Sequence, residues 1–170
     1  MSGQSAIQKV DRSSMEILSL KEHAGFIPQL AAWCHEEWKD FYGGKTVEDV
    51  RAYFAANTRL DSIPITYVAV EEGRLCGTVT LDVEDLDLRG YEDVSPWLVC
   101  LYVEKAQRGR CLGRQLIHHA VDEASRLKLS SLHLWTENLE SMYLQLGWRV
   151  LERTRFHDHD ITVMRRDFIN

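Results

Sequence analysis

The sequence predicts an α/β (α+β) fold with a mixed central sheet flanked by helices on both faces. Segments with the three-to-four-residue period of helices alternate along the chain with segments that have the two-residue period of strands. The segment from Trp97 to Val103 is almost continuously apolar, which is typical of a strand covered on both faces. These two observations place one buried strand near the middle of a sheet that helices cover.

The length and composition predict a single domain over residues 1–170. Most domains hold about 100–200 residues, so 170 residues suit one core. Hydrophobic residues make up 45% of the chain and charged residues 27%, which is typical of a folded globular protein. The 3 prolines and 10 glycines are scattered, so no linker or low-complexity segment divides the chain.

The first third of the chain predicts a strand and two helices. Residues Met15 to Leu20 alternate as in a short strand, and Phe26 to Phe41 carry apolar residues at helical spacing. The Gly43-Gly44 pair ends this helix. Thr46 with Asp49 three residues later resembles a capping box, and it predicts the start of the second helix.

A hairpin and a long helix surround the apolar strand. Ile65–Val70 and Leu75–Val83 are expected to pair through a turn with Gly73 at positive φ. An acidic connector, Asp82 to Asp93, then leads to the apolar strand. The remaining elements are predicted by periodicity and by Gly147 as a helix end. They are a helix from Leu112 to Leu127, a strand Ser131–Thr136, a short helix Leu139–Leu146, and strands Trp148–Arg155 and Ile161–Arg165.

Charge and apolar run length exclude two classes of partner. The formal net charge is −6, which argues against a protein that binds nucleic acid by neutralising phosphates. The apolar runs are far shorter than the roughly 20 residues that cross a membrane, and the start of the chain lacks a signal core. We therefore expect a cytoplasmic protein with no nucleic-acid or membrane partner.

The cysteines and histidines do not predict a disulfide or a metal site. Cysteines 34, 76, 100 and 111 lie far apart with no C-x-x-C pair, so buried free thiols are expected. The run His157-Asp158-His159-Asp160 is interpreted as a polar loop because zinc sites need further ligands at set spacing. His118 and His119 are expected at the surface, and His133 is expected as a hydrogen-bonded residue in a strand.

The junction after the apolar strand carries the strongest functional signal. There the sequence Arg108-Gly109-Arg110-Cys111-Leu112-Gly113-Arg114 opens a helix. A helix start presents unpaired backbone N–H groups and the positive end of the helix dipole, which bind anions such as phosphate. Glycine lets the main chain approach a ligand closely. Taken alone, this segment predicts an anion site, and a tight turn with solvent-facing arginines is the alternative.

The chain resembles the GCN5-related N-acetyltransferases (GNAT) at this junction and at two further elements. The family signature is Gln/Arg-x-x-Gly-x-Gly/Ala, which Arg108 and Gly113 match while Cys111 replaces the first glycine. Ser95-Pro96-Trp97-Leu98 and Tyr143-Leu144-Gln145-Leu146-Gly147-Trp148 also resemble family elements. The likeness covers about residues 60–168, and more weakly the two N-terminal helices. It implies the single-domain acyl-CoA N-acyltransferase fold.

The resemblance implies acetyl-CoA as the acyl-donor cosubstrate, with no metal. Backbone groups of Leu101, Tyr102 and Val103 would pair with pantetheine. The implied diphosphate-binding residues are Arg108, Gly109, Arg110, Cys111, Leu112, Gly113 and Arg114. Cys111 is expected to be tolerated, because a first helical turn does not demand positive φ.

The resemblance also implies direct transfer to a primary amine of a small molecule or peptide, in a ternary complex. Tyr143 is the implied acid for the leaving thiolate, with a core aromatic as the alternative. Among the connector carboxylates, Glu84, Asp85, Asp87, Glu92 and Asp93, we take Glu84 and Glu92 as catalytic candidates for the amine proton. Trp97 and Trp135 are candidates to line the acceptor pocket.

Several alternatives remain at this point. A noncatalytic acyl-CoA-binding sensor or scaffold of the same fold is favoured by Cys111 and by the lack of an obvious base. An enzyme that uses a longer acyl chain is another. A homodimer is also open, because dimers are common among relatives.

Overall fold

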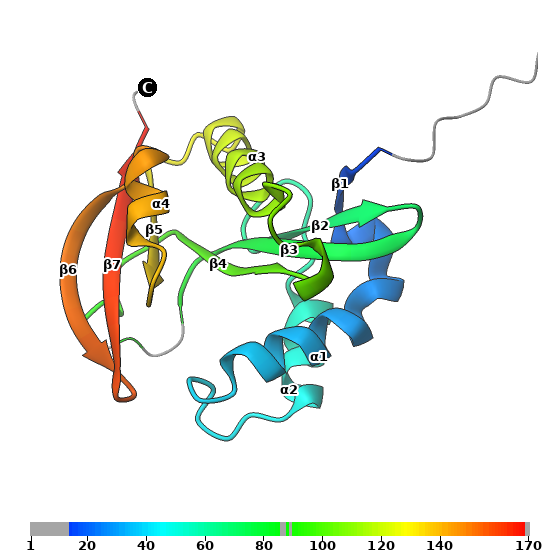
Figure 1. The fold of residues 1–170 in the computed structure, drawn as a ribbon, viewed down its shortest axis with the longest axis horizontal. Helices are drawn as coiled ribbons and strands as arrows, with labels where there is room; N and C mark the ends of the chain where they lie inside the picture. Colours follow the sequence, from blue (N-terminus) through cyan, green and yellow to red (C-terminus); the bar gives the residue numbers. More distant parts are fainter. Residues whose placement is uncertain (1–13, 86–87, 89, 169–170) are drawn as a thin grey trace, which may run out of the picture.

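A seven-stranded sheet organises the protein in a computed structural model, which describes residues 14–85, 88 and 90–168 (Figure 1). The strand order is β1-β2-β3-β4-β5-β7-β6, in which β4 and β5 are parallel and the other neighbours are antiparallel. The strands are β1 (Glu16–Ser19), β2 (Ile65–Glu71), β3 (Arg74–Asp82), β4 (Trp97–Val103), β5 (Ser131–Thr136), β6 (Arg149–Phe156) and β7 (His159–Asp167). The mixed sheet with β4 at its centre confirms the expected fold class.

The helices follow the expected order and begin where local chemistry favours them. They are α1 (Ile27–Trp38), α2 (Val47–Ala56), α3 (Leu112–Arg126) and α4 (Glu140–Gln145), with short 3-10 turns at Leu20–Phe26 and Lys105–Gln107. The capping box at α2 is confirmed. The Asp49 backbone N–H donates to Thr46 Oγ1 at 3.2 Å, and the Thr46 backbone N–H donates to Asp49 Oδ2 at 2.7 Å.

Helices cover both faces of the sheet. In Figure 1, α3 lies above the central strands and α1 and α2 lie below them. The buried face of α3, which includes Leu116, Ile117 and Ala120, packs on Leu81 and Leu98 of the sheet. Leu30, Cys34 and Phe54 belong to the second cluster, on the α1 and α2 side. The two clusters hold the central strands between apolar layers.

Both tight hairpins depend on residues at positive φ. Gly73 (φ 76) and Glu72 (φ 51) form the turn between β2 and β3, as predicted. In the last hairpin, His157 (φ 47) and Asp158 (φ 65) form the turn, while His159 already pairs with Phe156 in β7. The expected four-residue loop, His157 to Asp160, is therefore wrong in length, because a two-residue turn suits the twist of the paired strands.

The central strands β4 and β5 diverge soon after they meet. Among the described residues, Trp97 and His133 form their one register pair, and the His133 backbone N–H donates to Pro96 O at 2.9 Å. On its other side, β4 has a bulge: Thr80 pairs with Val99 and Thr78 with Tyr102, and Cys100 within it has φ 52. A bulge bends a strand and disrupts its ladder. The two strands therefore form a wedge that opens toward their carboxyl ends.

Candidate active site

The wedge between β4 and β5 opens into a cavity of about 710 Å³. Residues 98–101 of β4 and 134–136 of β5 line it, together with the ends of α1, α2 and β3 and with α4. This volume lies within the range of small-molecule sites, about 300–1,000 Å³. Trp135 lines the cavity, whereas Trp97 is 1% exposed and belongs to the core beside it. The suggestion that Trp97 lines the pocket is therefore wrong, because its indole N–H turns back to Val94 O at 2.7 Å.

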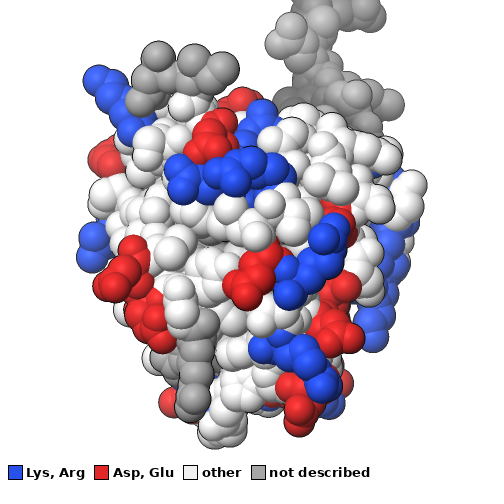
Figure 2. Space-filling view, turned by 90° about the vertical axis from the view of Figure 1, so that its left-hand side faces the viewer, with Lys and Arg blue, Asp and Glu red and all other residues white. Residues whose placement is uncertain are grey.

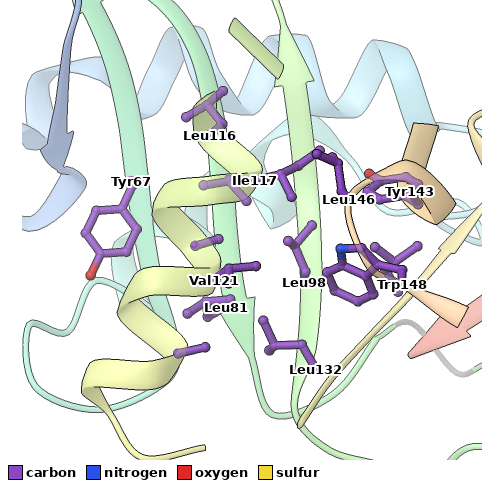
Figure 3. Packing of buried hydrophobic residues seen from close by; sticks show 14 of the residues in the cluster. Tyr67, Leu81, Leu98, Leu116, Ile117, Val121, Leu132, Tyr143, Leu146 and Trp148 are labelled. Carbon is purple, nitrogen blue, oxygen red and sulfur yellow. The ribbon is translucent and has the colours of Figure 1, made fainter. Parts of the chain in front are cut away.

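Tyr143 of α4 reaches the cavity with an unused hydroxyl group. Its side chain extends from α4 toward β4 and lies against Trp148, at 5.8 Å between ring centroids (Figure 3). The residue is 4% exposed, yet its hydroxyl group has no hydrogen-bond partner among the described residues. Burial raises the pKa of Tyr143, so the phenol keeps its proton. A neutral donor without a protein partner among the described residues therefore faces the cavity.

Three carboxylates gather where β3 ends. Asp82 is 4% exposed, and its carboxylate accepts the Tyr53 hydroxyl and, at 2.6 Å, the Val83 backbone N–H. Glu84 and Asp85 follow on the connector, and all three residues line the cavity. Burial raises the pKa of Asp85 from 3.8 to about 7, a shift that the charge of Asp82 reinforces. Asp85 therefore changes charge near neutral pH.

The connector candidates divide between the cavity and the outer surface. Glu84 lies with Tyr143 around the cavity, but Glu92 and Asp93 are exposed and are not among the residues that line it. The Glu92 carboxylate accepts the Gly90 backbone N–H at 2.9 Å, which ties it to its own loop. Asp87 lies outside the described residues. Of the connector carboxylates that the structure describes, Glu84 and Asp85 thus line the cavity, and Glu92 and Asp93 do not.

The start of α3 departs from expectation at Cys111. This residue is the N-cap of α3 and has φ 61 and ψ 13, in the left-handed region. The expectation that the position needs no positive φ is therefore wrong, because the chain turns into the helix one residue before the first helical turn. Gly109, at φ 81, has a second left-handed conformation in the same loop. The family signature has glycine at this position, where the backbone is left-handed. Because Cys111 has a side chain, its backbone is strained here.

Replacing Cys111 with Gly is expected to raise the free energy of unfolding by roughly 0.5–1 kcal/mol. A side chain in the left-handed region costs about 1–2 kcal/mol, and the extra freedom of glycine in the unfolded chain offsets part of the gain. Denaturant titration measures the change. Cys111→Ala is the matched control, because it keeps Cβ and removes the thiol. Equal stability of the two variants would show that backbone strain is absent.

The three arginines of the loop are bound to neighbouring groups. Arg108 Nε donates to Val103 O at 3.0 Å, and its guanidinium lies over the Tyr102 ring at 5.6 Å. Arg110 forms an ion pair with Glu71 at 2.7 Å, and Arg114 donates to Gln145 at 2.9 Å. Arg108 and Arg110 remain exposed to solvent, so the alternative of a turn with solvent-facing arginines stays open, but the three side chains tie the loop to β2, β4 and α4. These arginine contacts fix the conformation of the loop around its glycines.

The three β4 residues predicted to contact a coenzyme differ in their surroundings. Leu101 lines the cavity, whereas the Tyr102 side chain is buried against Trp33, at 5.4 Å between ring centroids. Val103 approaches the start of α3, where a Cβ built on Gly113 would lie 3.8 Å from Val103 Cγ2. That distance is an ordinary contact. The protein itself therefore leaves room for a side chain at 113.

The histidine and cysteine predictions have mixed outcomes. His133 is buried and bonded to Pro96 O at 3.1 Å, as expected, but His119 is half-buried against the Tyr67 ring at 4.4 Å rather than at the surface. The His119 side chain packs on β2, because the Tyr67 side chain extends over α3, where its hydroxyl group donates to Glu123. The four cysteines are free, as expected, but the expectation that all are buried is wrong. Cys34 and Cys76 are buried, whereas Cys111 is exposed because it lies in the loop before α3. The described residues contain no group of three His, Cys, Asp or Glu placed to hold a metal.

Sequence patterns missed four charged residues of the cavity. Glu37 of α1, Lys45 after it, Asp49 of α2 and Glu137 after β5 all line it. Asp49 was identified only as a capping residue. These residues lie on elements that meet through tertiary packing, so no spacing in the sequence connects them. Among the described residues, no helix is long and apolar enough to cross a membrane.

Comparisons with known proteins agree with this geometry. The model of the Acetyltransferase (GNAT) family matches residues 30–148. No curated protein matches the sequence. Among solved structures, an aminoglycoside 6'-N-acetyltransferase complexed with coenzyme A is 16% identical, with a TM-score of 0.69, over 91% of this chain and 98% of that one.

Two further structures show the same fold at low identity. A GCN5-related N-acetyltransferase from Kribbella flavida is 18% identical, with a TM-score of 0.68, over 91% of this chain and 98% of that one. The N-acetylglutamate synthase from Neisseria gonorrhoeae, complexed with coenzyme A and N-acetyl-glutamate, is 15% identical, with a TM-score of 0.66, over 93% of this chain. This chain spans 36% of that enzyme. Because the family model matches well over half of the chain, the protein belongs to the GNAT acetyltransferase family.

Proposed function

We propose that the protein is an N-acetyltransferase that moves the acetyl group of acetyl-CoA to a primary amine by direct attack. Family membership supports acyl transfer in general, and the coenzyme A in two similar structures supports a coenzyme A donor. The wedge between β4 and β5 suits a pantetheine arm, because its diverging strands leave main-chain groups without a strand partner. The loop before α3 suits the diphosphate.

The proposed reaction balances with the groups that line the cavity. The neutral amine nitrogen attacks the thioester carbonyl carbon, and an N–C bond forms. The C–S bond then breaks, and the thiolate leaves with a proton from the Tyr143 hydroxyl. The attacking nitrogen loses one proton to a carboxylate or to water, and Tyr143 is reprotonated from solvent. The products are an amide and free coenzyme A.

The unpartnered hydroxyl group of Tyr143 is the observation that carries this proposal. Among the described residues, the buried side-chain atoms without a partner are His119 Nε2, Trp135 Nε1 and Trp148 Nε1. The Tyr143 hydroxyl group differs from them, because it has no partner in the described part of the chain but remains open to the cavity. A role as proton donor explains why it faces a cavity and not a protein acceptor. A tyrosine that served only as core packing would be equally stable as phenylalanine.

The carboxylates at the end of β3 supply the acceptor for the amine proton. Alkyl amines are largely protonated at neutral pH, so the ammonium group must lose one proton before attack, in addition to the proton that the nitrogen loses as the amide forms. A carboxylate can accept the first of these protons. Asp85 is suited to this step, because a base works best when its pKa lies near the working pH. Glu84 lies on the same connector and lines the same cavity. We assign the step to this pair, with Asp85 as the closer match.

Two measurements test the proposed function. Calorimetry should show that acetyl-CoA binds, and release of free thiol with a panel of amines should show turnover. A noncatalytic sensor of the same fold would bind the coenzyme and release no thiol with any amine. Mass spectrometry of the product should show an added acetyl group. A longer added acyl chain would replace acetyl in the proposal and leave the reaction class intact.

Replacing Gly113 with Ala is expected to weaken acetyl-CoA binding at least about tenfold, or 1.4 kcal/mol. The added Cβ makes an ordinary contact with Val103, so the fold should stay intact or gain up to about 1 kcal/mol. The loss would come from a methyl group placed where the diphosphate approaches the helix start. Calorimetry with Gly25→Ala as control checks this, because Gly25 also has open space around it. Unchanged affinity in Gly113→Ala would contradict the assignment of this loop.

A further inference from the structure

The cavity has acidic walls on three sides. Six of the residues that line it are acidic, and Lys45 is its one basic residue among the described residues. Glu37 and Asp49 come from α1 and α2, Asp82, Glu84 and Asp85 from the end of β3, and Glu137 from the end of β5. Because these elements are far apart in the sequence, the excess of negative charge is a property of the assembled site. A run of acidic residues in one exposed loop would not produce it.

Neighbouring cations neutralise little of this charge. The Glu37 carboxylate lies 3.9 Å from the Arg108 guanidinium, and the Glu137 carboxylate lies 2.7 Å from the His159 ring. Hydrogen bonds from Thr46 lower the Asp49 pKa, and the positive charge of Lys45 lowers it further, so this carboxylate stays charged with one cation nearby. Asp82 accepts neutral donors, and Glu84 and Asp85 form no ion pair among the described residues. At least three carboxylates therefore face the cavity without a cation.

The outer surface of the sheet shows the opposite arrangement. Figure 2 views the side on which β6 lies, where basic and acidic side chains are interspersed. There Arg153 pairs with Glu140 at 2.6 Å, and Arg155 pairs with Asp160 at 3.4 Å. Glu140 and Asp160 are thus paired with arginines on this face, whereas Glu84 and Asp85 in the cavity form no ion pair among the described residues. The imbalance points to a cation that the ligand itself must bring.

The unpartnered Tyr143 hydroxyl group marks the end of the cavity where the acyl group is transferred to the acceptor. The Tyr143 residue is 4% exposed and its hydroxyl group has no partner among the described residues, while the unpaired carboxylates, Glu84 and Asp85, lie on the wall that follows β3. An acceptor that reaches Tyr143 with one amine therefore lies along the acidic walls with the rest of its length. A second ammonium group on that length would meet carboxylates. A carboxylate on it would meet like charge with one lysine to oppose it.

We propose that the acceptor is a polyamine-type compound, with two or more amino groups and no carboxylate. This inference rests on the proposed N-acetyltransferase function and deepens it by naming the substrate class. The reacting amine enters the cavity as a neutral nitrogen, and the remaining ammonium group stays charged and pairs with the acidic walls. Exclusion of zwitterions follows from like-charge repulsion, which supplies specificity by disfavouring the wrong substrates.

A matched set of three amines tests this inference. The compounds are 1,4-diaminobutane, n-butylamine, which lacks the second amine, and ornithine, which adds a carboxylate to the diamine. Thiol release is measured at saturating acetyl-CoA, and kcat/KM should be about 10- to 100-fold higher for the diamine than for either comparison amine. This range corresponds to one charge-assisted contact of about 1.5–3 kcal/mol. Spermidine and an aminoglycoside then distinguish a linear from a cyclic polyamine.

A pair of glutamate variants locates the effect. Glu84→Gln should reduce the ratio of kcat/KM for diamine over butylamine by about tenfold, since it removes one unpaired cavity charge. Glu36→Gln removes the same charge from the outer face of α1, where Glu36 pairs with Lys39, and should leave the ratio unchanged. A ratio that is equally reduced in both variants would assign the preference to net charge alone and overturn the inference.

The failure of this inference can be told apart from the failure of the proposed function. Thiol release with butylamine or ornithine at the rate of the diamine would retain acetyl transfer and overturn the polyamine assignment. Binding of acetyl-CoA without thiol release for any amine, spermidine and the aminoglycoside included, would overturn acetyl transfer itself, and the acceptor class with it. A strong preference for the diamine that is weakened by Glu84→Gln alone supports both.

Discussion

Replacing Tyr143 with Phe is expected to lower kcat by about 10²–10³, with little change in KM for the amine. Proton transfer by a positioned side chain raises a rate by about 10²–10⁴. We expect a loss toward the low end of this range, because water can still protonate the leaving thiolate. The ring keeps its packing against Trp148. Because the hydroxyl group has no protein partner to lose, the variant should be as stable as the wild-type protein or slightly more so.

Thiol release and denaturant unfolding, measured on the same samples, check this result. The matched control is Tyr67→Phe, because the Tyr67 hydroxyl donates to Glu123 at 2.6 Å and does not line the cavity. That variant should keep its turnover and lose about 1 kcal/mol of stability. Tyr143→Phe should thus lose turnover and keep its stability, whereas Tyr67→Phe should keep turnover and lose stability. A Tyr143→Phe enzyme within threefold of the wild-type kcat would remove Tyr143 from the mechanism.

Replacing Asp85 with Asn is expected to stabilise the protein at pH 8 by up to about 4 kcal/mol while it lowers turnover. Burial raises the pKa of this carboxyl group from 3.8 to about 7, and each pKa unit corresponds to 1.36 kcal/mol. The amide carries no charge to bury, so the cost disappears. Turnover should fall, because an amide cannot accept the amine proton. A residue retained at such a cost is expected at a working site.

The sign of the pH dependence follows from the same shift. Between about pH 4 and pH 7 the folded protein holds a proton on Asp85 that the unfolded chain has lost. Stability from this group is therefore fully present below pH 4 and is lost as the pH rises to about 7. The advantage of Asp85→Asn should be near zero at pH 4 and greatest above pH 7.

Unfolding free energies measured across this pH range provide the comparison. Asp93→Asn serves as control, since Asp93 is exposed on the same connector and should not change the pH dependence. If the wild-type protein and Asp85→Asn differed by the same amount at pH 4 and pH 8, the raised pKa would not be the cause. A fully active Asp85→Asn enzyme would leave Glu84 or water as the proton acceptor.

The sequence was sufficient wherever a local chemical signal decides the structure. The capping box of Thr46 and Asp49, Gly73 in its turn and Gly147 after α4 each act over a few residues, so their elements were predicted close to their observed bounds. The apolar run Trp97–Val103 likewise required a central strand. The Tyr143 element was identified through resemblance, and the structure places its side chain at the cavity.

The rest depended on packing that no local pattern records. Cys111 has positive φ because of how the chain enters α3, which residue type alone does not show. His119 is half-buried because Tyr67 from another element lies over it. The acidic character of the cavity required α1, α2, β3 and β5 to meet. Glu37 and Glu137, 100 positions apart in the chain, line the same cavity for that reason alone.

The meagre pairing of β4 with β5 divides the sheet into a ribbon of four strands, β1 to β4, and one of three, β5, β7 and β6. An extended donor molecule with amide groups that lay in this gap would act as a surrogate strand and complete the ladder. The cosubstrate would then be part of the architecture as well as the chemistry. Its arrival would mechanically couple the half of the molecule that carries Tyr143 to the half that carries the acidic connector.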